Sequence, residues 1–151
     1  MNRLSTDDLN RVLKRNDVTK RVYIGGFPAC VIPETRKKRY FFITNTDQHD
    51  EPGKHWTAWM MDGDKVEFFD SFGRSPENEQ FPEQFRYHII GKRVLYSDFS
   101  VQEYSSSACG YFCMYYIYFR SLGLDFNYII KQLKNLKDND DIVISFINSL
   151  I

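Results

Sequence analysis

Four side chains in the sequence could together catalyse acyl transfer. Cys109 offers a thiol, which is a strong nucleophile once it is ionised. His55 and Asp70 offer an imidazole that can move a proton and a carboxylate that can hold the imidazole in one tautomer. Gln102, seven positions before Cys109, offers amide N–H donors for a developing oxyanion. These residue types predict covalent catalysis by a thiol, provided that the fold brings them together.

A predicted hairpin brings two of these residues together. Asp62-Gly63 lies between two β-prone segments, which is a strong signal for a two-residue hairpin turn. With these two residues as the turn, His55 would face Asp70 directly, on the same side of the sheet. Turn chemistry alone therefore predicts an imidazole–carboxylate pair.

A predicted helix gives Cys109 its setting. The apolar segment 109–122, which Gly123 follows, is typical of a buried helix. Cys109 would then lie at the helix N-terminus, where the helix dipole favours the thiolate. An ion pair with His55 would activate the thiol further, and the backbone N–H of Cys109 and the amide of Gln102 are candidate oxyanion donors.

The surrounding segments predict an α+β fold. It consists of a central, mainly antiparallel sheet flanked by helices, with the nucleophile at the N-terminus of a buried helix. We expect one domain spanning 1–151. Expected helices begin at Ser5 and cover 75–85, 109–122, 126–136 and 141–150, and expected strands cover 39–44, 55–61, 64–70 and 93–99. Gly25-Gly26-Phe27-Pro28 is expected to interrupt regular secondary structure, and 45–54 and 105–107 are expected to be loops.

Composition limits the class of protein. The sequence is 42% hydrophobic and 26% charged with a formal net charge of zero, which is ordinary for a globular protein and provides no global field for nucleic acid or anionic membrane. Three cysteines argue against a disulfide framework and favour a reducing, intracellular compartment. No segment approaches the length of a membrane helix, and no secretory leader is evident.

Each candidate residue also has a structural interpretation when it is taken alone. A buried cysteine at a helix start is usually inert, and an aspartate before a serine is often a turn residue. Cys109 and Cys113 have the i, i+4 spacing of zinc ligands, but no histidine or second cysteine pair accompanies them, so we expect no metal. His49 and His88 lie in polar or mixed stretches and are expected to be solvated.

The four candidates occur in short motifs whose order and spacing are specific. The motifs are Lys54-His55-Trp56, Phe69-Asp70-Ser71-Phe72-Gly73, Val101-Gln102 and Ser107-Ala108-Cys109-Gly110-Tyr111-Phe112-Cys113. Together they resemble the motifs of adenain, the adenovirus endopeptidase, over roughly residues 42–119.

The resemblance implies a function for each motif. Cys109 would attack the scissile carbonyl, His55 would take and return the proton, Asp70 would orient His55, and Gln102 would stabilise the oxyanion. The implied enzyme is a monomeric maturation endopeptidase that cleaves capsid and core precursors after glycine-rich, Gly-Gly-like sites, in the virion and the host nucleus or cytoplasm. The sequence itself requires no cofactor, whereas the resemblance implies that an activating peptide or DNA could act as one.

Some features depart from the adenain pattern. The acid is Asp70 where adenovirus enzymes have Glu, and aspartate is the choice of the related SUMO-processing proteases. No cysteine lies between Asp70 and Cys109, so the disulfide that tethers the activating peptide of adenain would be missing. Because the chain is neutral, DNA binding would be weak and local, for example at the basic cluster 36–39.

Two other functions therefore stay open. A protease for ubiquitin-like modifiers would share the fold and would also act after Gly-Gly. A non-catalytic module that binds capsid protein or DNA would need none of the four candidate side chains.

Overall fold

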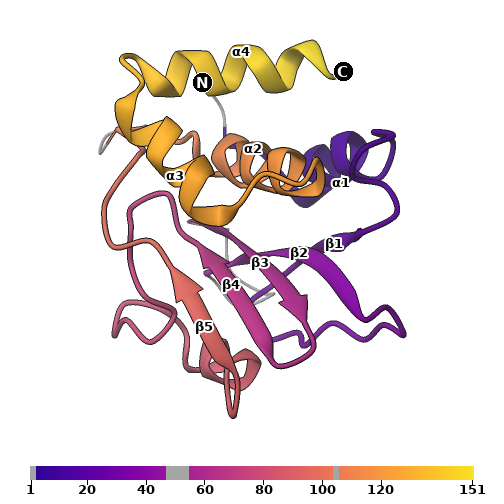
Figure 1. Ribbon diagram of the computed structural model, residues 1–151. Helices are drawn as coiled ribbons and strands as arrows, with labels where there is room; N and C mark the ends of the chain where they lie inside the picture. The colour runs from indigo at the N-terminus through magenta and orange to yellow at the C-terminus, as the bar shows by residue number, and fades with distance from the viewer. Residues whose placement is uncertain (1–2, 47–54, 104–105) are drawn as a thin grey trace.

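The computed structural model describes residues 3–46, 55–103 and 106–151. It has an α+β fold in which four helices cover one face of a five-stranded sheet (Figure 1), as the sequence predicts. The helices are α1 (Thr6–Leu13), α2 (Cys109–Ser121), α3 (Phe126–Asn135) and α4 (Asn139–Ser149). The strands are β1 (Tyr23–Phe27), β2 (Arg39–Asn45), β3 (Trp56–Asp62), β4 (Lys65–Phe69) and β5 (Arg93–Tyr96), and a 3-10 helix, η1, covers Glu83–His88.

The sheet is antiparallel in its centre and parallel at both edges. Its order follows the chain, β1-β2-β3-β4-β5, with β2–β3 and β3–β4 antiparallel and β1–β2 and β4–β5 parallel. Strand β1 runs through Gly25-Gly26, where the sequence predicts an interruption of secondary structure. Gly25 has a φ of 144° and accompanies an irregularity in the register, so the glycines kink an edge strand rather than end it.

The β3–β4 hairpin forms, but its turn is one residue further along than expected. Asp62 pairs with Lys65, so Gly63 and Asp64 make the turn, and Gly63 has the positive φ of 60° that such a turn needs. Residues of one strand therefore face partners two positions beyond those predicted. Because side chains alternate with a period of two, this shift leaves every side chain on its predicted face.

One predicted helix is wrong. The segment 75–85 forms turns, and only from Glu83 does the 3-10 helix η1 begin. Pro82 explains the difference, because a proline interrupts an α-helix and here has an extended ψ of 144° just before η1. Of the predicted loop 45–54, residues 47–54 lie outside the described residues, and Asn45 is the last residue of β2. Of the predicted loop 105–107, Ser106 and Ser107 are described and belong to no helix or strand.

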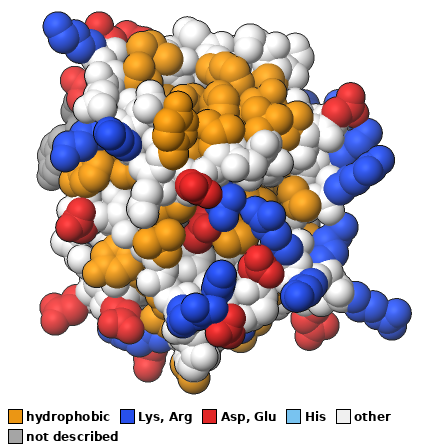
Figure 2. Space-filling view, viewed as in Figure 1, with side chains coloured by type: hydrophobic (Ala, Val, Ile, Leu, Met, Phe, Trp, Pro, Cys, Tyr) orange, Lys and Arg blue, Asp and Glu red, His pale blue; other side chains and the backbone are white. Residues whose placement is uncertain are grey.

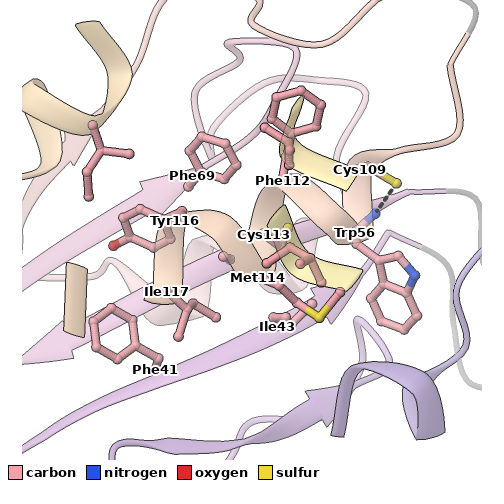
Figure 3. Packing of buried hydrophobic residues seen from close by; sticks show 14 of the residues in the cluster. Phe41, Ile43, Trp56, Phe69, Cys109, Phe112, Cys113, Met114, Tyr116 and Ile117 are labelled. Carbon is pink, nitrogen blue, oxygen red and sulfur yellow. Dashed lines mark hydrogen bonds between the residues drawn. The ribbon is translucent and has the colours of Figure 1, made fainter. Parts of the chain in front are cut away.

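Helix α2 is the centre of the main core. It lies between the sheet and α4, with α1 and α3 beside it (Figure 1), and Phe112, Cys113, Tyr116 and Ile117 are fully buried (Figure 3). At its far end, the Glu67 carboxylate on β4 receives hydrogen bonds from the Arg120 guanidinium at 2.9 Å and the Tyr116 hydroxyl at 2.8 Å. This buried ion pair fixes α2 against the sheet.

A second, aromatic core covers the opposite face of the sheet. It joins Phe42, Trp59 and Phe68 of the strands to Phe85 of η1. His88 is buried in this core, with its ring centroid 4.8 Å from that of Trp59. The prediction from the sequence that His88 is solvated is therefore wrong. Both faces of β3 are therefore covered, which explains its nearly continuous apolar sequence.

The surface is mixed in charge. Figure 2 shows Lys, Arg, Asp and Glu side chains interspersed on one face, with hydrophobic side chains gathered over the helical layer. Among the described residues, no helix is long and apolar enough to cross a membrane.

Candidate active site

Cys109 occupies the first position of α2, as predicted. Its Sγ lies at the edge of the core and accepts a hydrogen bond from the backbone N–H of Trp56 at 3.4 Å (Figure 3). The first N–H groups of a helix have no partner within the helix, so the helix start directs positive charge at the sulfur and leaves N–H donors beside it. The side chain of Trp56 is held in turn, because its indole N–H donates to the Leu4 carbonyl at 2.9 Å.

His55 and Asp70 meet at the open end of the hairpin. His55 directly precedes β3 and Asp70 directly follows β4, and the Nε2 of His55 lies 2.5 Å from the Oδ1 of Asp70. If the observed β3–β4 register is extended, Phe72 is opposite His55 and Asp70 is its diagonal neighbour. The Phe72 ring accordingly stacks on the imidazole, with centroids 5.1 Å apart.

The imidazole also forms a hydrogen bond with the thiol of Cys109. Since Asp70 engages Nε2, Nδ1 is the ring nitrogen that remains for the thiol. Burial would lower the pKa of His55, but its interactions with Asp70 and Cys109 raise it to about 9. Burial would likewise raise the pKa of Cys109, yet the interactions with His55 and the Trp56 N–H bring it below its ordinary value. At neutral pH these shifts favour a thiolate–imidazolium pair.

A second cation holds Asp70, which is itself buried. The backbone N–H and Nε of Arg74 donate to Asp70 Oδ2 at 3.0 and 2.8 Å, while Oδ1 remains with His55. Burial would raise the pKa of Asp70, but His55 and Arg74 lower it below its ordinary value. The Arg74 guanidinium is fixed by Gln80 at 3.0 Å and by the Phe81 ring 4.4 Å beneath it. The carboxylate therefore stays charged and immobile.

Gln102 shares a pocket with the thiol. A pocket of about 600 Å³ is lined by His55, Phe72, Gln102 and Cys109, among others. The Nε2 of Gln102 donates to the Ser106 carbonyl at 2.8 Å, and its Oε1 accepts a hydrogen bond from the Ser71 hydroxyl. The structure thus brings His55, Gln102 and Cys109 to one pocket, and the fourth residue singled out from the sequence, Asp70, is buried next to His55.

The turn 70–74 contacts both His55 and Gln102, and sequence reasoning assigned no role to its residues after Asp70. Ser71 contacts Gln102, Phe72 stacks on His55, and Arg74 holds Asp70. Gly73 has a φ of 73°, and a Cβ there would lie 2.2 Å from the Phe99 carbonyl carbon, so the turn fits only because this residue has no side chain. The sequence offered two signals, the motif Asp70-Ser71-Phe72-Gly73 and an arginine four positions after the acid.

Metal chemistry finds no support in the described residues. No group of three or more His, Cys, Asp or Glu side chains in 3–46, 55–103 and 106–151 is arranged to hold a metal ion. Cys113 lies fully buried one turn after Cys109, and burial raises the pKa of its thiol well above the ordinary value. Cys113 is therefore a core residue with an unreactive thiol.

Comparison with known proteins relates the chain to viral proteases. The family described as adenovirus endoprotease matches residues 21–148. Among solved structures, the crystal structure of the selenomethionine form of the ASFV pS273R protease is similar, with 25% sequence identity and a TM-score of 0.45 over 68% of this chain. The chain spans 41% of that protease's length. No curated protein matches the chain.

Proposed function

Because the chain belongs to the adenovirus endoprotease family and is a cysteine peptidase, we propose that it is a maturation endopeptidase that cleaves capsid or core precursor proteins after glycine-rich sites. The observation that carries the proposal is the hydrogen-bonded series from Asp70 through His55 to Cys109, at a pocket that Gln102 also lines. Residues 1–151 would form one catalytic domain.

The proposed mechanism follows from the charges at the site. The Cys109 thiolate attacks the scissile carbonyl, and the carbonyl oxygen becomes an oxyanion that the Gln102 amide and the Cys109 N–H stabilise. The imidazolium of His55 gives its proton to the leaving amine, which departs and leaves a thioester. Neutral His55 then takes a proton from water, and the hydroxide that forms attacks the thioester to release the acid and the thiolate. Asp70 holds the imidazole throughout.

A second candidate function differs from this one in its protein substrates. A peptidase for ubiquitin-like modifiers would use the same chemistry, and the aspartate at position 70 favours it because that branch of related enzymes uses aspartate. We place it second because the family match is to the adenovirus endoprotease. We further propose a monomer in the virion or infected cell, with weak DNA binding at most and with no obligatory cofactor.

The test is the cleavage of a fluorogenic Leu-Xaa-Gly-Gly peptide by reduced protein. Wild type, Cys109→Ala and Cys113→Ala are compared, and a ubiquitin-like fusion protein is offered in parallel. We expect Cys109→Ala to lose turnover by several orders of magnitude, whereas Cys113→Ala, which removes a thiol from the same helix, keeps it.

Each result has a distinct meaning. Turnover that persists in Cys109→Ala refutes the proposed nucleophile, and preference for the fusion protein over the peptide favours the second candidate function. If the wild type is silent, the assay is repeated with DNA and with virion extract. Activity that appears only then refutes the absence of an obligatory cofactor, and continued silence counts against the proposed substrates.

A further inference from the structure

We propose that Ser71 is a positioning residue, which orients the Gln102 side chain so that one of its N–H groups is available to the oxyanion. The inference rests on the proposed function, since it assigns a partner to the oxyanion donor of that reaction. Ser71 is fully buried and touches neither His55 nor Cys109 in any interaction described above.

The argument starts from the two ends of the amide. A glutamine side chain has an oxygen that only accepts hydrogen bonds and a nitrogen that only donates them. The Ser106 carbonyl only accepts, so the group 2.8 Å from it must be Nε2. The other end, Oε1, therefore faces the Ser71 hydroxyl, which donates to it.

The donors of Gln102 can then be counted. Nε2 carries two N–H groups, of which one is used by Ser106. The second belongs to a side chain that lines the pocket with Cys109. An oxyanion donor contributes most when its orientation is fixed before the reaction, and the Ser71 and Ser106 contacts fix the plane of this amide.

The backbone that carries Gln102 is fixed separately. The carbonyl of Ser71 accepts hydrogen bonds from the N–H groups of Val101 at 2.8 Å and Gln102 at 3.2 Å. The Asp140 carboxylate, at the start of α4, accepts a hydrogen bond from the Glu103 N–H at 3.0 Å. Because these contacts do not involve the Ser71 hydroxyl, Ser71→Ala removes one of the two restraints on the amide and leaves those on the backbone.

Loss of the hydroxyl has a defined consequence. In Ser71→Ala, Oε1 is buried without its donor, and the amide lowers its free energy by rotating toward another partner or toward water in the pocket. The second N–H then spends less time directed at the oxyanion. The thiolate–imidazolium pair, which Asp70 and Trp56 hold, is unchanged.

The experiment measures two properties of the same variants. The first is peptide turnover, which needs the oxyanion donors. The second is the rate of Cys109 alkylation by iodoacetamide, a displacement that forms no oxyanion and depends only on the thiolate. The variants are Ser71→Ala, Gln102→Ala and their combination. Ser97→Ala is the matched control, since the Ser97 hydroxyl is also buried but bonds to the Phe99 carbonyl.

We expect Ser71→Ala to lower kcat about tenfold with KM little changed, and Gln102→Ala to lower it about a hundredfold. The double variant should be no slower than Gln102→Ala, because Ser71 acts only through that side chain. Alkylation rates should match the wild type in all variants, and Ser97→Ala should keep full turnover.

Three results would overturn the inference while the proposed function stands. The first is an unchanged kcat in Ser71→Ala. The second is an equal loss of turnover and alkylation rate in Ser71→Ala, which would indicate a merely structural role. The third is a loss of turnover in the double variant that equals the product of the two single losses. A wild type that alkylates rapidly but never cleaves peptide would instead overturn the proposed function, and this inference with it.

Discussion

The pH dependence of an Asp70→Asn variant tests whether the carboxylate sets the charge of the catalytic imidazole. In the wild type, Asp70 lies 2.5 Å from His55 and contributes to raising the pKa of that imidazole from 6.5 to about 9. Asparagine keeps the shape of the side chain but removes its charge. The imidazolium should therefore lose its proton at lower pH.

The size of the effect follows from the pKa. A rise from 6.5 to about 9 corresponds to about 3 kcal/mol of preferential stabilisation of the imidazolium, achieved against the opposing effect of burial. Asp70 and Cys109 share this stabilisation, and the hydrogen bond to Asp70 is its largest part. An opposite charge at such a distance shifts a pKa by about one to three units. Asp70→Asn should lower the pKa of His55 by at least about one unit.

The assay is kcat/KM for peptide cleavage between pH 5 and pH 10, which reports the titrating groups of the free enzyme. The active form has the thiolate and the imidazolium, so wild-type activity should fall as the pH rises through about 9. In Asp70→Asn this alkaline limb should move down by at least about one pH unit, and loss of the imidazolium alone should lower kcat/KM at pH 8 by at least about twofold.

A matched variant controls for loss of charge in general. Asp64→Asn removes an exposed carboxylate from the turn at the other end of the same hairpin, and it should leave the profile unchanged. If the alkaline limb of Asp70→Asn coincides with that of the wild type, Asp70 does not control the protonation of His55. The electrostatic argument would then be wrong, whatever the loss in rate.

Further variants test the framework that carries the site. Gly73→Ala should abolish most peptidase activity because its Cβ would overlap the Phe99 backbone. Gly91 has a similar φ of 70° but open space around it, so Gly91→Ala should lower the free energy of unfolding by about 1 kcal/mol and keep full peptidase activity. Glu67→Ala should lower the free energy of unfolding in urea by about 3 kcal/mol, because the partly buried Arg120 and the fully buried Tyr116 hydroxyl both lose their partner, and a loss below about 1 kcal/mol would contradict this. Burial lowers the pKa of His88 to about 4, so the unfolded chain binds a proton that the folded chain excludes, and stability should fall by up to about 3 kcal/mol from pH 6.5 to pH 4. His88→Leu should remove this acid sensitivity in urea titrations at pH 5 and pH 7.5, and an equal loss in both proteins would refute it.

The sequence was sufficient to anticipate the His55–Asp70 contact even though the turn was misplaced. Asp62-Gly63 was expected to form the turn, but Gly63 and Asp64 do. An error of one residue in the position of the turn moves facing partners by two positions, and two positions preserve the face of the sheet. The side chain of His55 is long enough to reach a diagonal neighbour instead of a direct one.

Other features depend on contacts that no local pattern encodes. At the two edges of the sheet, β1 pairs in parallel with β2 and β5 pairs in parallel with β4, and packing between distant segments decides both pairings. The glycines of β1 also hide this strand in the sequence. The supporting contact of Ser71 depends on a partner that the fold brings close, Gln102, which is 31 positions away in the sequence. The absence of an α-helix over 75–85 does follow from a local feature, because Pro82 interrupts that segment.

The hairpin that carries His55 and Asp70 also has a consequence for how the enzyme acquires its reactivity during folding. These two residues are 15 positions apart and share one turn, so their pairing closes a short loop and can form early. The contact between Trp56 and Cys109 spans 53 positions and needs α2 to dock on the sheet. We therefore expect the thiol to remain an ordinary, largely protonated cysteine in folding intermediates. The Cys109 thiol would then become a reactive nucleophile only once the core is complete, so a newly made chain would not cleave other proteins before it has folded.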